Sequence, residues 1–141
     1  MREVLTGVTF LFGQGNEGRD NETKVFCKLV AGNTVVAQGS FGGTGTGAFG
    51  PVLTGHLGKF TFSPRPGTWT KDFVESDARP AVVIEPEGSD TWDCSFTVFL
   101  DFLGDDANHY RYRSQEFGKT LNEHDREALG DLFQLEGPIW P

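Results

Sequence analysis

Apolar and polar residues alternate over residues 92–100, and one set of alternate positions is entirely apolar. These apolar positions are Trp92, Cys94, Phe96, Val98 and Leu100. Successive side chains of a β-strand point to opposite faces, so this spacing gives the segment one face that can be fully buried. We therefore predict that residues 89–101 form the central strand of the protein, and that the acidic turn at its start links the core to a functional site.

Shorter runs of the same alternation predict further strands. They cover residues 4–12, 23–31, 34–41, 59–62, 79–85 and 109–115. Gly32-Asn33 is typical of a hairpin turn, and Gly104-Asp105-Asp106 favours a second tight turn. Short strands separated by turns at this spacing predict an all-β protein, an antiparallel β-sandwich of about seven to eight strands.

The C-terminal region contains the one helix that the sequence predicts. Asn122 is a favourable N-cap, and Glu123 and Asp125 follow in the first turn, where carboxylates interact well with the helix dipole. Leu129, Leu132 and Phe133 would form a small apolar stripe. We expect a short helix near residues 123–132.

Two connections have no regular period. Residues 42–58 form a glycine-rich stretch, and a loop this long in a compact domain is functional, poorly ordered, or contains a short edge strand. Residues 69–77 are expected to be an acidic connection. Exposed aromatic residues favour glycan and protein contacts, so we predict that Trp69 and the 42–58 loop contact a ligand.

Length and charge restrict the function. The 141 residues predict one domain over residues 1–141, and 20 acidic against 12 basic residues give a net charge of −8. A net-negative surface repels phosphate backbones, so we expect no nucleic-acid partner. No apolar run approaches the roughly 18 residues of a membrane span, and the N-terminus lacks the apolar region of a signal peptide. We expect a monomer that is not transmembrane.

Cys27 and Cys94 both occupy core-facing positions of predicted strands. Free cysteine is among the most often buried residue types, so two buried thiols are one interpretation. A single disulfide in an oxidising compartment is the other. The sequence leaves both open.

Several familiar motifs are incomplete. Residues 45–50 match G-x-G-x-x-G, but Pro51 follows where a dinucleotide site needs a helix. Residues 118–120 resemble the end of a phosphate-binding loop, but Arg113 stands where the earlier glycine is required. The three histidines show no metal-ligand spacing. No complete catalytic motif is present.

Acidic turns carry the strongest candidate chemistry, a calcium site. The candidate ligands are Asn16, Glu17, Asp20, Asn21, Glu22 and Asp90. Calcium is a hard cation that takes six to eight oxygen ligands, including carboxylates and carbonyls. In a sandwich, the turn before the second strand and the turn before the central strand could lie at one end. The alternative is that these turns are simply solvated, which is the commoner case.

Glu85 and Glu87 provide an enzymatic alternative. Two residues apart in an extended chain, their Cα atoms would lie about 6.5–7 Å from each other on one side. That separation is close to that of paired glycosidase carboxylates. A small jelly-roll glycan hydrolase is therefore the alternative function, although Pro86 and Gly88 indicate a turn at this place.

Four short segments carry a family resemblance. They are residues 19–25 (RDNETKV), 33–38 (NTVVAQ), 84–92 (IEPEGSDTW) and 121–127 (LNEHDRE). Together they resemble calcium-binding β-sandwich modules of the C2 and PLAT-like kind, closest to small accessory domains attached to secreted bacterial proteins. The resemblance implies a non-catalytic module that binds calcium through Asp20, Glu22 and Asp90. It also implies a lipid surface, a glycan or a protein as partner. A third possible function, beside the binding module and the hydrolase, is a structural domain that recognises another part of its own parent protein.

Overall fold

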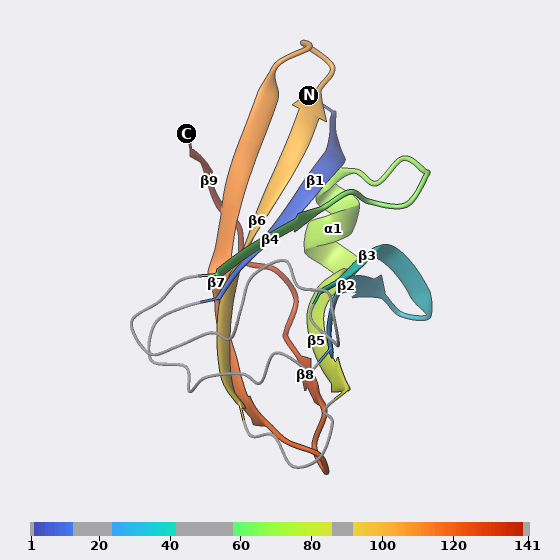
Figure 1. Cartoon of the computed structure of the whole chain (residues 1–141). Helices are drawn as coiled ribbons and strands as arrows, with labels where there is room; N and C mark the ends of the chain where they lie inside the picture. The colour runs from blue at the N-terminus through green and yellow to red at the C-terminus, as the bar shows by residue number, and fades with distance from the viewer. Residues whose placement is uncertain (1, 13–23, 42–57, 86–91, 140–141) are drawn as a thin grey trace.

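Two antiparallel β-sheets face each other in the structure, a computed structural model that describes residues 2–12, 24–41, 58–85 and 92–139 (Figure 1). The strands are β1 Glu3–Phe12, β2 Lys24–Ala31, β3 Thr34–Phe41, β4 Gly58–Phe62, β5 Arg79–Glu85, β6 Trp92–Gly104, β7 His109–Leu121, β8 Glu127–Leu129 and β9 Glu136–Ile139. The predicted all-β antiparallel sandwich is confirmed. The described residues contain nine strands where about seven to eight were expected.

The five-stranded sheet has the order β4-β1-β6-β7-β9, so β6 is its middle strand. Residues 89–101 were predicted to form the central strand; residues 89–91 lie outside the described ranges, and for residues 92–101 the prediction is confirmed. Leu100 of β6 lies opposite Val8 of β1 on one side and Tyr112 of β7 on the other. In Figure 1, β6 and β7 run side by side as the longest hairpin of the fold.

The four-stranded sheet has the order β3-β2-β5-β8. The hairpin between β2 and β3 turns at Gly32, whose φ of 60° lies in the left-handed region that glycine adopts most easily. The predicted Gly-Asn turn is therefore present. On β2, Val25, Cys27 and Leu29 are completely buried and form the inner face of this sheet.

The core lies between the two sheets and is rich in phenylalanine. The rings of Phe10 and Phe96 stack with their centroids 5.3 Å apart, and Phe96 also stacks on Phe117 at 5.4 Å. Cys27 and Cys94 are both buried and free, so the interpretation as two buried thiols is confirmed. Burial raises the pKa of each thiol, and Cys94 raises that of Cys27 further.

The predicted helix near residues 123–132 is wrong. Asn122 does accept hydrogen bonds through Oδ1 from the backbone N–H groups of His124 and Asp125, but these close a turn. The chain then forms β8, which pairs with β5 and buries Ala128. Asparagine caps turns as readily as helices, so tertiary pairing with β5 decided between them.

The described residues contain one helix, α1 Lys71–Asp77, within the segment that was expected to be an acidic connection. Thr70 is its N-cap and accepts a hydrogen bond from the N–H of Phe73 at 3.2 Å. Val74 is buried, and the helix lies beside β1 (Figure 1). No helix of the described ranges is long and apolar enough to cross a membrane.

Candidate ligand-binding site

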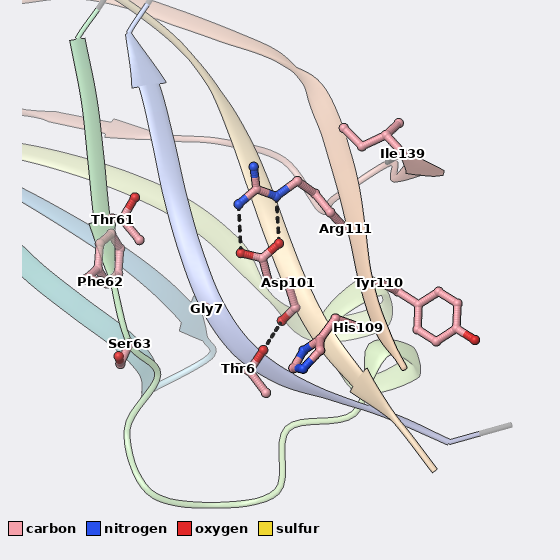
Figure 2. Close-up of a pocket in the computed structure, with 10 residues that line it drawn as sticks. All are labelled: Thr6, Gly7, Thr61, Phe62, Ser63, Asp101, His109, Tyr110, Arg111 and Ile139. Atoms are coloured by element: carbon pink, nitrogen blue, oxygen red, sulfur yellow. Dashed lines mark hydrogen bonds and ion pairs between the residues drawn. The ribbon is translucent and has the colours of Figure 1, made fainter. Parts of the chain in front are cut away.

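A pocket of about 440 Å3 lies on the five-stranded sheet (Figure 2). We call it the sheet pocket. The side chains that matter for its chemistry are Thr6, Thr61, Asp101, His109, Arg111 and Ile139. Asp101 lies between the buried residues Leu100 and Phe102 on β6, so its side chain points to the face opposite the core. The pocket is therefore on the outer face of the sheet.

A bulge in β1 shapes the base of this pocket. Leu5 pairs with Phe102 and Gly7 pairs with Asp101, so Thr6 is an extra residue with no direct partner in the ladder. The Thr6 hydroxyl donates a hydrogen bond to the carbonyl oxygen of Asp101 at 3.2 Å. A β-bulge changes the direction of nearby side chains and is over-represented at functional sites.

Gly7 lies directly against the Asp101 side chain. A Cβ atom at position 7 would lie 3.3 Å from Oδ2 of Asp101, which is a tighter contact than such atoms normally make. Any side chain here would press on the carboxylate. The glycine therefore lets the Asp101 side chain lie close against β1 without displacement, although a glycine inside a strand costs about 0.5–1 kcal/mol relative to alanine.

Asp101 and Arg111 form a two-point ion pair across β6 and β7. Nε of Arg111 donates to Oδ1 at 2.7 Å and Nη2 donates to Oδ2 at 3.1 Å. This paired geometry is the strongest that arginine and a carboxylate form. The hydrogen bond with Asp101 raises the pKa of Arg111 above its ordinary value, so the guanidinium stays charged. The pair brings one positive and one negative charge into the pocket, and its net charge is zero.

The aromatic ring of Phe99 supports the Arg111 side chain. Its centroid is 5.8 Å from Cζ of Arg111, within the range of a cation–π contact. Phe99 lies two residues before Asp101 on β6, so both side chains are on the outer face. One strand therefore supplies both the carboxylate and the ring that hold the guanidinium in place.

Hydroxyl groups and the apolar side chains of Phe62 and Ile139 complete the wall. The Thr61 and Thr9 hydroxyls are 2.9 Å apart and share a hydrogen bond, and His109 follows from the start of β7. Ile139 of β9 lies opposite Arg111. Figure 2 shows the ring of Tyr110 directed away from the Asp101–Arg111 pair. Its hydroxyl instead donates to Asp106 at 2.5 Å.

The chemistry of the pocket suits binding. Among the described residues that line it, Asp101 is the only carboxylate, and both of its oxygens accept hydrogen bonds from Arg111. Glycoside hydrolysis in its usual form uses two carboxylic groups with different protonation. The described lining residues therefore offer fixed hydrogen-bond donors and acceptors around a single ion pair.

The six residues predicted to bind calcium all lie outside the described residues. They are Asn16, Glu17, Asp20, Asn21, Glu22 and Asp90. Within residues 2–12, 24–41, 58–85 and 92–139, no group of three or more His, Cys, Asp or Glu side chains is arranged to hold a metal. Calcium binding and the resemblance to C2 and PLAT-like modules stay predictions.

Of the other predicted site residues, some lie within the described ranges and some lie outside them. Glu85 is exposed at the end of β5, whereas Glu87 and most of the 42–58 loop lie outside the described ranges. Trp69 is half-buried, packs on Phe73 with 5.8 Å between ring centroids, and donates from Nε1 to the carbonyl oxygen of Arg65 at 2.9 Å. It lies outside the sheet pocket, and its role in ligand binding stays a prediction.

Sequence reasoning missed Asp101 and Arg111, although the sequence held a signal for them. Both lie at polar positions of strands that were predicted, on either side of the tight turn at Gly104. Extending the pairing back from that turn would have brought the two residues opposite each other. Gly7 inside a predicted strand was a second signal, because an isolated glycine there often marks a bulge.

Comparison with known proteins gives no relative for this chain: no protein-family model, no curated protein and no solved structure matches it.

Proposed function

We propose that this protein is a non-catalytic binding module that holds a small polar ligand in the sheet pocket. The observation that carries the proposal is the Asp101–Arg111 pair, which lines a pocket of about 440 Å3 together with threonine hydroxyls. Ligand sites are usually concave, about 300–1,000 Å3 in volume, with a few polar groups that fix orientation. The sheet pocket has these properties.

The position of the site in the fold supports this function. Asp101 belongs to the middle strand of the five-stranded sheet, which is paired on both sides. Binding groups on regular strands are held more precisely than groups on loops, and a ligand loses less free energy when the site is already ordered. The structure thus supports recognition through a preformed site.

The charges of the pocket indicate the kind of partner. The whole chain carries a net charge of −8, while the pocket pairs its arginine with an aspartate. Neither the long-range field nor the pocket attracts a polyanion. A small polar molecule, or the polar part of a larger glycan, is the partner class that fits.

An NMR titration tests this function. A set of neutral, anionic and cationic small polar fragments is added to the isotope-labelled 141-residue chain, and backbone amide shifts are followed. We expect at least one fragment to shift Gly7, Thr61 and Arg111 together in a saturable way. Residues of the buried core, such as Val98, should shift far less. If no fragment of any charge moves the pocket amides, the proposed function is wrong.

A further inference from the structure

The Asp101–Arg111 pair keeps hydrogen-bonding capacity after the two groups have bound each other. A carboxylate has about four acceptor positions and a guanidinium has five N–H donors, and the pair uses two of each. Figure 2 shows the third nitrogen of Arg111 directed away from the carboxylate. The side chains of Asp101 and Arg111 are 28% and 38% exposed, so a ligand can reach both. One ligand can therefore accept from Arg111 and donate to Asp101.

Charged ligands fit this arrangement poorly. An anion would compete with Asp101 for Arg111 and would meet repulsion from the carboxylate. A cation would compete with Arg111 for Asp101 in the same way. A neutral hydroxyl both donates and accepts, so adjacent hydroxyls of one molecule satisfy both partners and leave the ion pair intact.

The remaining walls match such a molecule. Thr6 and Thr61 add hydroxyl groups, and the half-buried side chain of Ile139 adds an apolar surface on the β9 side. Gly7 has no side chain and lies close beside Oδ2 of Asp101, so no side chain from β1 covers the carboxylate there. A ring that carries hydroxyls on its edge and C–H groups on its faces has this distribution of polar and apolar surface.

We propose that the sheet pocket binds a neutral saccharide, with Asp101 accepting from and Arg111 donating to adjacent ring hydroxyls. This inference rests on the proposed function and names its ligand class. It also makes the ion pair a specificity determinant, because its zero net charge is what favours a neutral ring over its charged relatives.

The ligand class is tested with an array of mono- to tetrasaccharides, both neutral and charged, probed with the full chain. Isothermal titration then compares the strongest neutral binder with rings that differ in charge, and glucose, glucuronate and glucosamine are the simplest such set. We expect neutral rings to bind more tightly than both charged rings. Absence of binding to every neutral saccharide would overturn the inference. If NMR still shows another polar fragment in the pocket, only the ligand class fails and the proposed function stands.

The ion pair is tested by Asp101→Asn, which keeps the shape and removes the negative charge. We expect affinity for the neutral saccharide to fall roughly tenfold to hundredfold, as for loss of a charged hydrogen-bond partner. Because Arg111 loses its negatively charged partner and keeps at most a neutral acceptor, affinity for glucuronate should rise. The matched control is Glu136→Gln, which removes the carboxylate that Arg113 contacts at 3.3 Å on the neighbouring strand. An unchanged neutral-to-anionic preference in Asp101→Asn would contradict the assignment.

The place of binding is tested by two glycine variants on β1 and β7. Gly7→Ala puts a methyl group 3.3 Å from Oδ2 of Asp101, and we expect at least about a tenfold loss of affinity. Gly118 lines a separate pocket of about 270 Å3 between β7 and β8. In Gly118→Ala the added methyl group makes only ordinary contacts, the nearest at 3.5 Å. This variant should bind normally. If Gly118→Ala loses affinity and Gly7→Ala binds normally, the saccharide lies in that second pocket and the inference is overturned.

Discussion

The two faces of the five-stranded sheet are built from the same strands and have opposite characters. On β6, Phe96, Val98 and Leu100 point inward and are at most 1% exposed. Phe99 and Asp101 point outward and are only partly buried, beside the arginines of β7. The inner face contributes apolar burial, and the outer face carries fixed polar groups around a pocket. The difference teaches that stability and recognition lie on alternate residues of one strand and can be changed separately.

The largest expected effect is on the inner face. Phe96→Ala removes a ring that stacks on Phe10 and Phe117, and we expect a loss of about 3–5 kcal/mol in the free energy of unfolding. The control is Thr97→Ala, the next residue on the opposite face, which should cost less than about 1 kcal/mol. Urea denaturation measures both. Equal losses for the two variants would remove the distinction between the faces.

The inner face should also protect its thiols. Burial raises the pKa of Cys27 and Cys94, so neither forms a thiolate near neutral pH in the folded protein. We expect a thiol reagent such as DTNB to react with both cysteines only as fast as the protein unfolds. The rate should therefore rise along the denaturant transition. Rapid reaction of either thiol in native buffer would show that this face is open to solvent.

The predicted calcium site would add a third region to the comparison. If calcium binds only the folded protein, a concentration about 100 times Kd stabilises it by about 2.7 kcal/mol. Thermal unfolding with calcium and with a chelator measures this difference. Equal midpoints would reject the calcium site, and Asp20→Asn should abolish any shift that is seen.

On the outer face, loss of the ion pair should affect stability little. Arg111→Gln removes a partly exposed salt bridge, and such pairs contribute about 0–1 kcal/mol. We expect a change of less than about 1 kcal/mol by urea denaturation, together with a clear loss of ligand affinity. A loss as large as that of Phe96→Ala would mean that the pair holds the fold and would weaken its assignment to recognition.

The smallest expected effect concerns the turn between β6 and β7. Hydrogen bonds from the Tyr110 hydroxyl and the Asn108 amide lower the pKa of the exposed Asp106 carboxyl. Since the folded pKa is the lower one, its contribution to stability is fully present above the ordinary Asp pKa. It is lost as the pH falls through the lowered pKa. Asp106→Asn should make acid unfolding slightly less steep, measured as Tm against pH. An unchanged acid profile would contradict this account of the turn.

Sequence reasoning predicted the strands well because a period of two is easy to see where one face is apolar. The segments at 4–12 and 23–31 correspond to β1 and β2 within one residue, and the segment at 89–101 corresponds to β6, which continues to Gly104. It missed α1, which has seven residues and buries only Val74, too short a segment to show a helical stripe. It placed a helix where β8 lies, because only pairing with β5 shows that the segment is extended.

The candidate site was harder to predict because it depends on register. Asp101 and Arg111 become partners only when β6 and β7 are aligned, and Gly7 joins them only through the bulge at Thr6. These three residues are far apart in the sequence and form no sequence motif that would have indicated the pocket. Acidic residues in turns formed a more visible pattern, and this favoured the calcium interpretation.

A crystal structure of the full chain with the strongest neutral saccharide from the array tests the central claim most directly. The account predicts one ring beside Gly7, with its hydroxyls hydrogen-bonded to the carboxylate of Asp101 and the guanidinium of Arg111. A saccharide bound at Trp69, in the 42–58 loop or in the second pocket between β7 and β8 would contradict it.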